Sequence, residues 1–170
     1  MMADLPLLKF VIDSNIWIDV FTSRAPNENA KHQSTQALEK AMNHGIIISS
    51  TQTEKELVKT LEMLLEKKTI TLREQELTLK AFKMFSIKTK NNSAGYIREN
   101  INELQQCKDG DDWQFLKLAD LNKAYAIISR DRHLLNVQYK DVKVMSSGEF
   151  LEKVLPLHGT PKRGIVCAKR

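Results

Sequence analysis

Short apolar runs alternate with longer segments of helical periodicity, and this alternation constrains the fold more than any other feature of the chain. Five runs have strand character, at residues 8–12, 46–48, 86–89, 125–128 and 142–145. The segments between most of them are long enough for the crossover helices that join parallel strands. The sequence therefore predicts an α/β fold in which a central, mainly parallel sheet carries helices on both faces.

The helices are predicted from apolar spacing and from residues that start or stop helices. Gly45 is a natural stop for one helix, and the polar residues 49–51 offer N-caps for the next. Asn91–Ser93 has the composition of a turn. We predict helices directly after Ser14 and over residues 30–44, 51–67, 71–85, 94–106, 112–123, 131–135 and 147–154.

The length and composition indicate one globular domain. The chain has 170 residues, of which 42% are hydrophobic and 28% charged, enough to bury a real core. It has no internal repeat and no convincing interior linker. We expect a single domain over residues 1–155, followed by a basic tail, rich in Pro and Gly, over residues 156–170.

The charge balance favours a polyanionic partner. The net charge is +5 and the isoelectric point is near 9.2, which suits nucleic acid. No apolar stretch reaches transmembrane length, and the first residues lack the basic region of a secretory signal. Cys107 and Cys167 form neither a disulfide framework nor a zinc pattern. We expect a cytoplasmic protein that does not bind membranes.

Two acids stand close after predicted strands. Asp13 ends the first apolar run, and Asp131 follows the strand at 125–128. Open α/β sheets bind ligands at the carboxyl ends of their strands, so these two acids indicate a shared acidic pocket. Each has an alternative interpretation as an N-cap of the helix that follows.

Further acids lie between these two. Asp112 heads a helical stripe with Phe115, Leu116 and Ala119, so it is expected to face inward, either as an N-cap or as part of a polar site. Near the start of an earlier helix, the apolar spacing alone does not choose between Glu54 and Glu56.

The chain lacks the sequence motifs of several other enzyme classes. The chain has no HExxH, no P-loop, no GxGxxG and no GxSxG. Zinc-protease chemistry, nucleotide hydrolysis, dinucleotide binding and serine-hydrolase chemistry are therefore not expected.

Four segments in order resemble the PIN-domain family, which includes the ribonuclease toxins of VapBC-type modules. They are Val11-Ile12-Asp13-Ser14-Asn15; Ser50, Thr53 and Glu56-Leu57; Asp109-Gly110-Asp111-Asp112 with Phe115, Leu116 and Ala119; and Ile128-Ser129-Arg130-Asp131 with Leu134-Leu135. The resemblance runs from about residue 8 to residue 154 and selects Glu56 over Glu54. It implies a PIN-like three-layer α/β/α fold.

Three features depart from the family pattern. Gly110 stands where Pro is common, and Arg130 stands where a small residue is common. Arg130 could pair with a phosphate or partly offset the acidic cluster. The helical segment at 62–106 is long for a minimal toxin of this family.

The resemblance implies a Mg²⁺- or Mn²⁺-dependent endoribonuclease that leaves a 5′-phosphate. Its catalytic and metal ligands would be Asp13, Glu56, Asp112 and Asp131. Four clustered carboxylates repel one another unless they take up protons or bind a cation, and oxygen ligands suit hard ions. Asn15 and Ser129 would orient these carboxylates or a metal-bound water.

RNA and a cognate antitoxin are the expected partners, and a homodimer is one of the arrangements left open. The alternative function is a non-catalytic PIN-like module that binds RNA or protein. A phosphoacceptor receiver domain also clusters acids at strand ends, but it needs a strand-end lysine that this chain does not offer.

Overall fold

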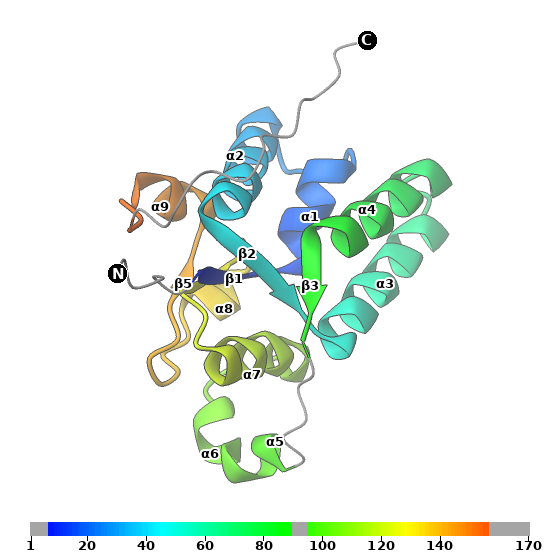
Figure 1. Cartoon of the computed structure of the whole chain (residues 1–170). Coiled ribbons are helices and arrows are strands. Elements are labelled where there is room, and N and C mark those ends of the chain that lie inside the picture. The colour runs from blue at the N-terminus through cyan, green and yellow to red at the C-terminus, as the bar shows by residue number, and fades with distance from the viewer. Residues whose placement is uncertain (1–6, 90–94, 157–170) are drawn as a thin grey trace.

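The computed structural model describes residues 7–89 and 95–156 and shows a sheet with helices on both faces (Figure 1). The strands are β1 (Leu8–Ile12), β2 (Gly45–Ser49), β3 (Ser86–Lys88), β4 (Ala126–Ile128) and β5 (Val144–Met145). The helices are α1 (Ser14–Phe21), α2 (Glu28–His44), α3 (Thr51–Glu66), α4 (Leu72–Phe85), α5 (Tyr96–Glu99), α6 (Ile101–Leu104), α7 (Trp113–Asn122), α8 (Arg132–Leu135) and α9 (Ser147–Glu152), with a 3₁₀ turn η1 at Gly110–Asp112.

The five strands form one parallel sheet in the order β3-β2-β1-β4-β5. From β1 the chain builds outward through β2 and β3 and then returns to place β4 on the other side of β1. The direction of winding therefore reverses between β1 and β4, and the carboxyl ends of these two strands meet at the reversal. That is where open α/β sheets bind ligands.

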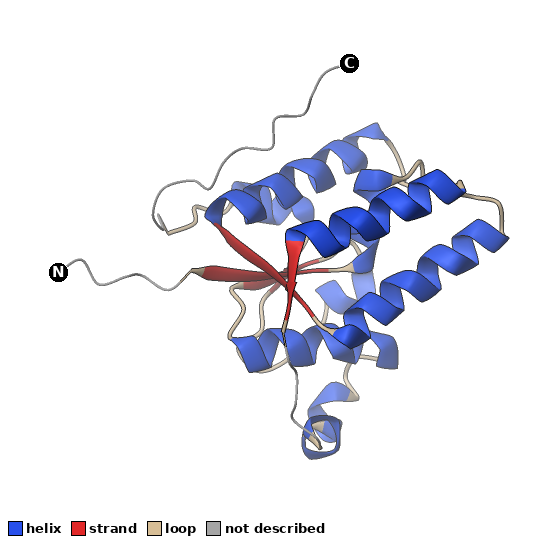
Figure 2. Ribbon diagram, turned by 45° about the vertical axis from the view of Figure 1, so that its right-hand side comes forward, coloured by secondary structure: helices blue, strands red, loops and turns tan. Residues whose placement is uncertain are grey.

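Alternate residues of each strand feed two separate cores, which gives the three layers predicted by the sequence. Phe10 and Ile12 pack on one side of the sheet, where α1, α2, α3, α4 and α9 bury their apolar faces. Val11 packs on the other side, under α5, α6, α7 and α8. Figure 2 shows helices on both sides of the strands. The central strand β4 is apolar and fully buried because both of its faces are covered, whereas the edge strand β3 is largely exposed.

Gly45 is needed for a close approach between strands. Its φ is −177°, which any residue adopts, so its role is not a left-handed helix stop. A Cβ atom at this position would lie 2.1 Å from the carbonyl oxygen of Leu8, the residue that it pairs with on β1. Only glycine lets β2 begin in this register.

Most of the predicted helices and strands are present, but several begin or end at other residues than predicted. The helix predicted from residue 30 begins at Glu28, since the side chain of Asn27 accepts the N–H of Ala30. The single helix predicted over 94–106 is wrong: α5 and α6 are two short helices separated at Asn100, whose side chain donates to the carbonyl of Tyr96. The last strand is shorter than predicted.

Two predictions fall on segments for which the structure gives no description. These are the turn at 91–93 and nearly all of the tail at 156–170, from which only Pro156 is described. The division into a domain over 1–155 and a tail stays a prediction.

Candidate active site at the carboxyl edge of the sheet

Asp13 lies at the end of β1, where the sheet reverses. Its N–H donates to the carbonyl of Ile128 at 3.0 Å, which ties it to the neighbouring end of β4. Its side chain is buried and makes no capping hydrogen bond to α1. Instead, Oδ2 accepts the hydroxyl of Ser129 at 2.6 Å. The bond to Ser129, and not a cap of α1, therefore fixes this carboxylate, although the backbone N–H groups of Ser14 and Asn15 also lower its pKa.

Asp131 does act as a cap. Its Oδ1 accepts the N–H of His133 at 2.7 Å at the start of α8. Its own N–H donates to Ser129 Oγ at 2.9 Å. Ser129 thus bridges the two acids, because it accepts from the backbone of Asp131 and donates to the side chain of Asp13.

Glu56 reaches the same edge from α3. Ser14 Oγ donates a hydrogen bond to Oε2, and Thr60 Oγ1 donates to Oε1 at 3.1 Å. The helix is held at its start by a capping box between Ser50 and Thr53. Glu54, in contrast, forms ion pairs with Lys83 and Lys88. The two glutamates that apolar spacing could not separate therefore have different surroundings.

Asp112 lies in η1, directly before α7, and is 7% exposed. It makes no capping bond to α7. The thiol of Cys107 lies 3.9 Å from its Oδ2 as a weak donor. Burial, followed by the charge of Asp112, raises the pKa of this thiol to about 11, so it stays protonated. Its neighbour Asp111 is exposed and pairs with Lys59.

The electrostatics show that these acids influence one another. Burial raises the pKa of Asp13 to about 6, with a further increase from Asp131 and an opposing hydrogen bond from Ser129. Burial and then Asp13 raise the pKa of Glu56 to about 7. Burial and then Asp13 and Asp131 raise the pKa of Asp112 to about 7. The negative charge at this edge can therefore be compensated in two ways: the acids take up protons, or they bind a cation.

The chemistry of the donors fits Mg²⁺ or Mn²⁺, since all four side chains present carboxylate oxygens. Their present arrangement is not a finished coordination shell. Within residues 7–89 and 95–156, no three His, Cys, Asp or Glu side chains lie close enough to hold a metal ion. Both oxygens of Glu56 accept hydrogen bonds from the protein, as do Oδ2 of Asp13 and Oδ1 of Asp131, so a cation would have to compete with those bonds.

The sequence of this edge also matches a known family. The family model of the PIN domain matches residues 9–133, which span the site from β1 to α8. The chain belongs to the PIN-domain family. No curated protein sequence gives a significant match.

A solved structure has the same fold as this PIN domain. It is the crystal structure of VapBC2 from Rickettsia felis bound to a DNA fragment from their promoter. The TM-score is 0.56, the sequence identity is 14%, and the match covers 82% of this chain and 98% of that chain. At this identity the likeness concerns the fold. Within the described part of the PIN domain, no helix is long and apolar enough to span a membrane.

Asn15 and Ser129, the residues predicted to orient the carboxylates, differ in how closely they contact Asp13. Ser129 makes the short bond to Asp13 already described. Asn15 lies at the outer limit of hydrogen bonding, with Nδ2 3.5 Å from Asp13 Oδ2, where such a bond contributes little. Ser14 was not singled out from the sequence, although it stands beside Asp13 and holds Glu56. Its position next to Asp13 in the first motif is the sequence feature that could have identified Ser14 as a site residue.

Arg130 does not reach into the acidic group. Its guanidinium forms an ion pair with Asp19 of α1, at 2.8 Å between Nε and Oδ2. Asp19 was not predicted from the sequence either. An acid inside the apolar segment Ile16–Phe21 is a signal for a buried partner, but nothing in the local sequence identifies that partner as Arg130.

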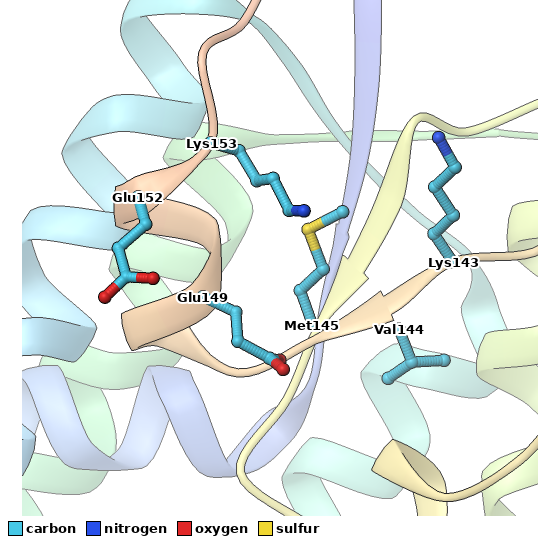
Figure 3. Close-up of a pocket in the computed structure, with 6 residues that line it drawn as sticks. All are labelled: Lys143, Val144, Met145, Glu149, Glu152 and Lys153. Carbon is cyan, nitrogen blue, oxygen red and sulfur yellow. The ribbon is translucent and has the colours of Figure 1, made fainter.

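A separate pocket lies between β5 and α9 (Figure 3), and none of the four acids lines it. Its charged side chains have mixed sign, and Lys143 and Glu152 lie at opposite sides of the view in Figure 3. Glu149 is already used, because its side chain accepts the N–H of Ser146 in a capping box. This pocket does not gather groups of one kind toward a ligand, so the carboxyl edge remains the candidate active site.

Proposed function

We propose that this PIN domain is a Mg²⁺- or Mn²⁺-dependent endoribonuclease. The observation that carries the proposal is the group of four carboxylates that includes Asp13, three of which have a pKa raised by burial and by neighbouring acids. They come from four separate parts of the chain, and perturbed acids gathered at a ligand-binding edge are a recurrent sign of an active site.

Asp13, Glu56, Asp112 and Asp131 would hold the metal. A bound divalent cation would supply charge stabilisation at the phosphodiester and a more acidic water. Ser129 keeps Oδ2 of Asp13 fixed, and Ser14 and Thr60 orient Glu56. Without metal, burial and the charge of Asp13 raise the pKa of Glu56 to about 7, so this carboxyl takes up a proton near physiological pH, and a bound cation would favour its ionised form. The basic chain would attract the RNA backbone.

We further propose that the chain is the toxin of a toxin-antitoxin pair in the cytoplasm, with a cognate antitoxin protein as its partner and a homodimer as a candidate assembly. The shared fold with VapBC2 supports this part of the proposal. Expression of the chain in a bacterial host should arrest growth, and the arrest should require Asp13. Growth at the normal rate with full-length, folded protein present would contradict the toxin role.

The enzymatic proposal is tested by incubating the purified protein with a mixed RNA pool, with Mn²⁺ or with a chelator. We expect cleavage with Mn²⁺ only, with 5′-phosphate ends on the products. The matched control is Asp13→Asn, which keeps the shape of the side chain but lacks its charge.

A second function is favoured by one observation. The described carboxylates are not converged around a metal position. A PIN domain that binds RNA or protein without cleaving it would show this arrangement permanently. RNA binding that survives in Mn²⁺ with no cleavage, together with no effect of Mn²⁺ on thermal stability, would favour this function over the nuclease.

A further inference from the structure

Arg130 and Asp19 form a two-point ion pair. The guanidinium donates from Nε to Oδ2 at 2.8 Å and from Nη2 to Oδ1 at 2.9 Å. Asp19 is fully buried, and its Oδ2 also accepts the hydroxyl of Ser34 on α2 at 3.3 Å. A buried carboxylate without such a partner is costly, and the planar guanidinium fixes both distance and orientation.

The position of this pair in the chain links it to the acidic edge. Arg130 stands between Ser129, which donates to Asp13, and Asp131, which is the fourth acid of the group. Asp19 is on α1, the helix that begins at Ser14 beside Asp13. The ion pair therefore attaches the segment between β4 and α8 to α1, in addition to the backbone bond from Asp13 to Ile128.

We propose that Arg130 is a positioning residue, which holds Ser129 and Asp131 in place against Asp13 through its two bonds to Asp19. The catalytic consequence rests on the proposed nuclease function, but the positioning itself does not. The pair fixes the loop at two points, through Nε and Nη2 of the guanidinium.

Amide hydrogen exchange tests the positioning without metal or RNA. The N–H groups of Asp131 and His133 bond to Ser129 Oγ and to Asp131 Oδ1, so their exchange reports the loop directly. In Arg130→Lys, which keeps the charge but loses the two-point geometry, we expect these two amides to exchange at least about ten-fold faster. The sheet amides of β1 and β2 should be unchanged.

A double variant and a control variant complete the test. Arg130→Met alone leaves Asp19 buried without its cation and can fail to fold. The double variant Asp19→Leu with Arg130→Met is used instead, because it removes both charges at once. The control is Arg73→Met, which removes a positive charge from an exposed position on α4. The double variant should show fast loop exchange, and the control should match the wild type.

Kinetics separates positioning from direct contact with RNA. Loss of positioning predicts a kcat lower by about 100-fold with an unchanged KM, and weaker Mn²⁺ affinity in a direct titration.

Unchanged exchange of the Asp131 and His133 amides in Arg130→Lys and in the double variant would overturn the proposal, whatever the cleavage rate. A raised KM with unchanged exchange would also overturn it and would mean that Arg130 contacts a phosphate. A wild type that does not cleave RNA would refute the nuclease proposal alone, since the exchange result still decides the positioning.

Discussion

Ser129 Oγ lies 2.6 Å from Asp13 Oδ2 and 2.9 Å from the amide nitrogen of Asp131, so one hydroxyl joins two acids that are 118 residues apart in the sequence. Its single proton is donated to Asp13, because the Asp131 amide can only donate. This bond favours the ionised form of Asp13 and opposes the effect of burial on its pKa.

Ser129→Ala should raise the pKa of Asp13 above its value of about 6, since the substitution removes a hydrogen bond to the ionised carboxylate. It should also leave the Asp131 N–H without its acceptor, at a cost of about 1–3 kcal/mol in unfolding free energy. An NMR titration of the Asp13 carboxyl measures the first effect and urea unfolding the second. An unchanged Asp13 pKa would mean that the Ser129 bond is not formed in solution.

Removing any one of the four carboxylate charges should abolish RNA cleavage without unfolding the protein. Asp13→Asn, Glu56→Gln, Asp112→Asn and Asp131→Asn each keep the shape of the side chain, and Asn at 131 can still cap α8. We expect losses of orders of magnitude, measured on a labelled RNA, with little change in the melting temperature without metal.

Two substitutions serve as controls for that series. Glu62→Gln changes an exposed acid on the same helix as Glu56. Asp111→Asn breaks an exposed ion pair with Lys59, a contact of the kind that contributes at most about 1 kcal/mol. Both should cleave at close to the wild-type rate. Wild-type cleavage by Asp13→Asn or Asp131→Asn would refute the assignment of these residues.

The sequence predicted that Asp13 and Asp131 lie at one edge of the sheet because both follow parallel strands, and parallel strands end at a common edge. It could not predict the bond between Ser14 and Glu56, since that contact depends on how α3 packs against α1. The sequence could not predict the pairing of Asp19 with Arg130 either, because the two residues are 111 positions apart. The break at Asn100 was missed because apolar spacing continues across it.

Lys40 should stabilise the fold without affecting the proposed chemistry. Its ammonium group donates to the carbonyls of Phe150, Leu151 and Lys153 at 2.6 to 3.0 Å, where α9 ends. Lys40→Met should therefore lower the unfolding free energy by about 1–3 kcal/mol in a urea titration. Lys80→Met, at an exposed position on α4, should have a much smaller effect. Equal effects of the two would show that the contacts at α9 contribute nothing specific.

RNA affinity should fall steeply with salt, because the basic chain meets the phosphate backbone through lysine and arginine. Lys67 and Lys68 are exposed, whereas Lys88 is paired with Glu54 and is therefore less available to a phosphate. Replacing both Lys67 and Lys68 with Gln should reduce the slope of log affinity against log salt by about 0.7 for each phosphate that these two side chains neutralise in the wild type. An unchanged slope would place the RNA-binding surface elsewhere.

The metal-free protein should be more stable at pH 5 than at pH 8. Burial raises the pKa of Asp13 from 3.8 to about 6 and that of Asp112 from 3.8 to about 7. The folded state therefore binds more protons than the unfolded state between about pH 4 and pH 7, and stability falls as the pH rises through this window. Because Asp112 is still about half protonated at pH 7, a smaller loss is expected between pH 7 and about pH 8 and none from these acids above that. Thermal melts in a chelator at several pH values measure the effect.

Mn²⁺ should reverse this dependence, because it binds the ionised carboxylates of the folded state only. At pH 8 millimolar Mn²⁺ should raise the melting temperature, and at pH 5 the same concentration should do little, since protons then occupy the acids. The double variant Asp13→Asn with Asp112→Asn should remove the metal response and most of the pH dependence; the remainder comes from Glu56, whose pKa burial raises to about 7. A Mn²⁺ shift that is equal at pH 5 and pH 8, or that persists in the double variant, would place the metal outside the carboxyl edge of the sheet.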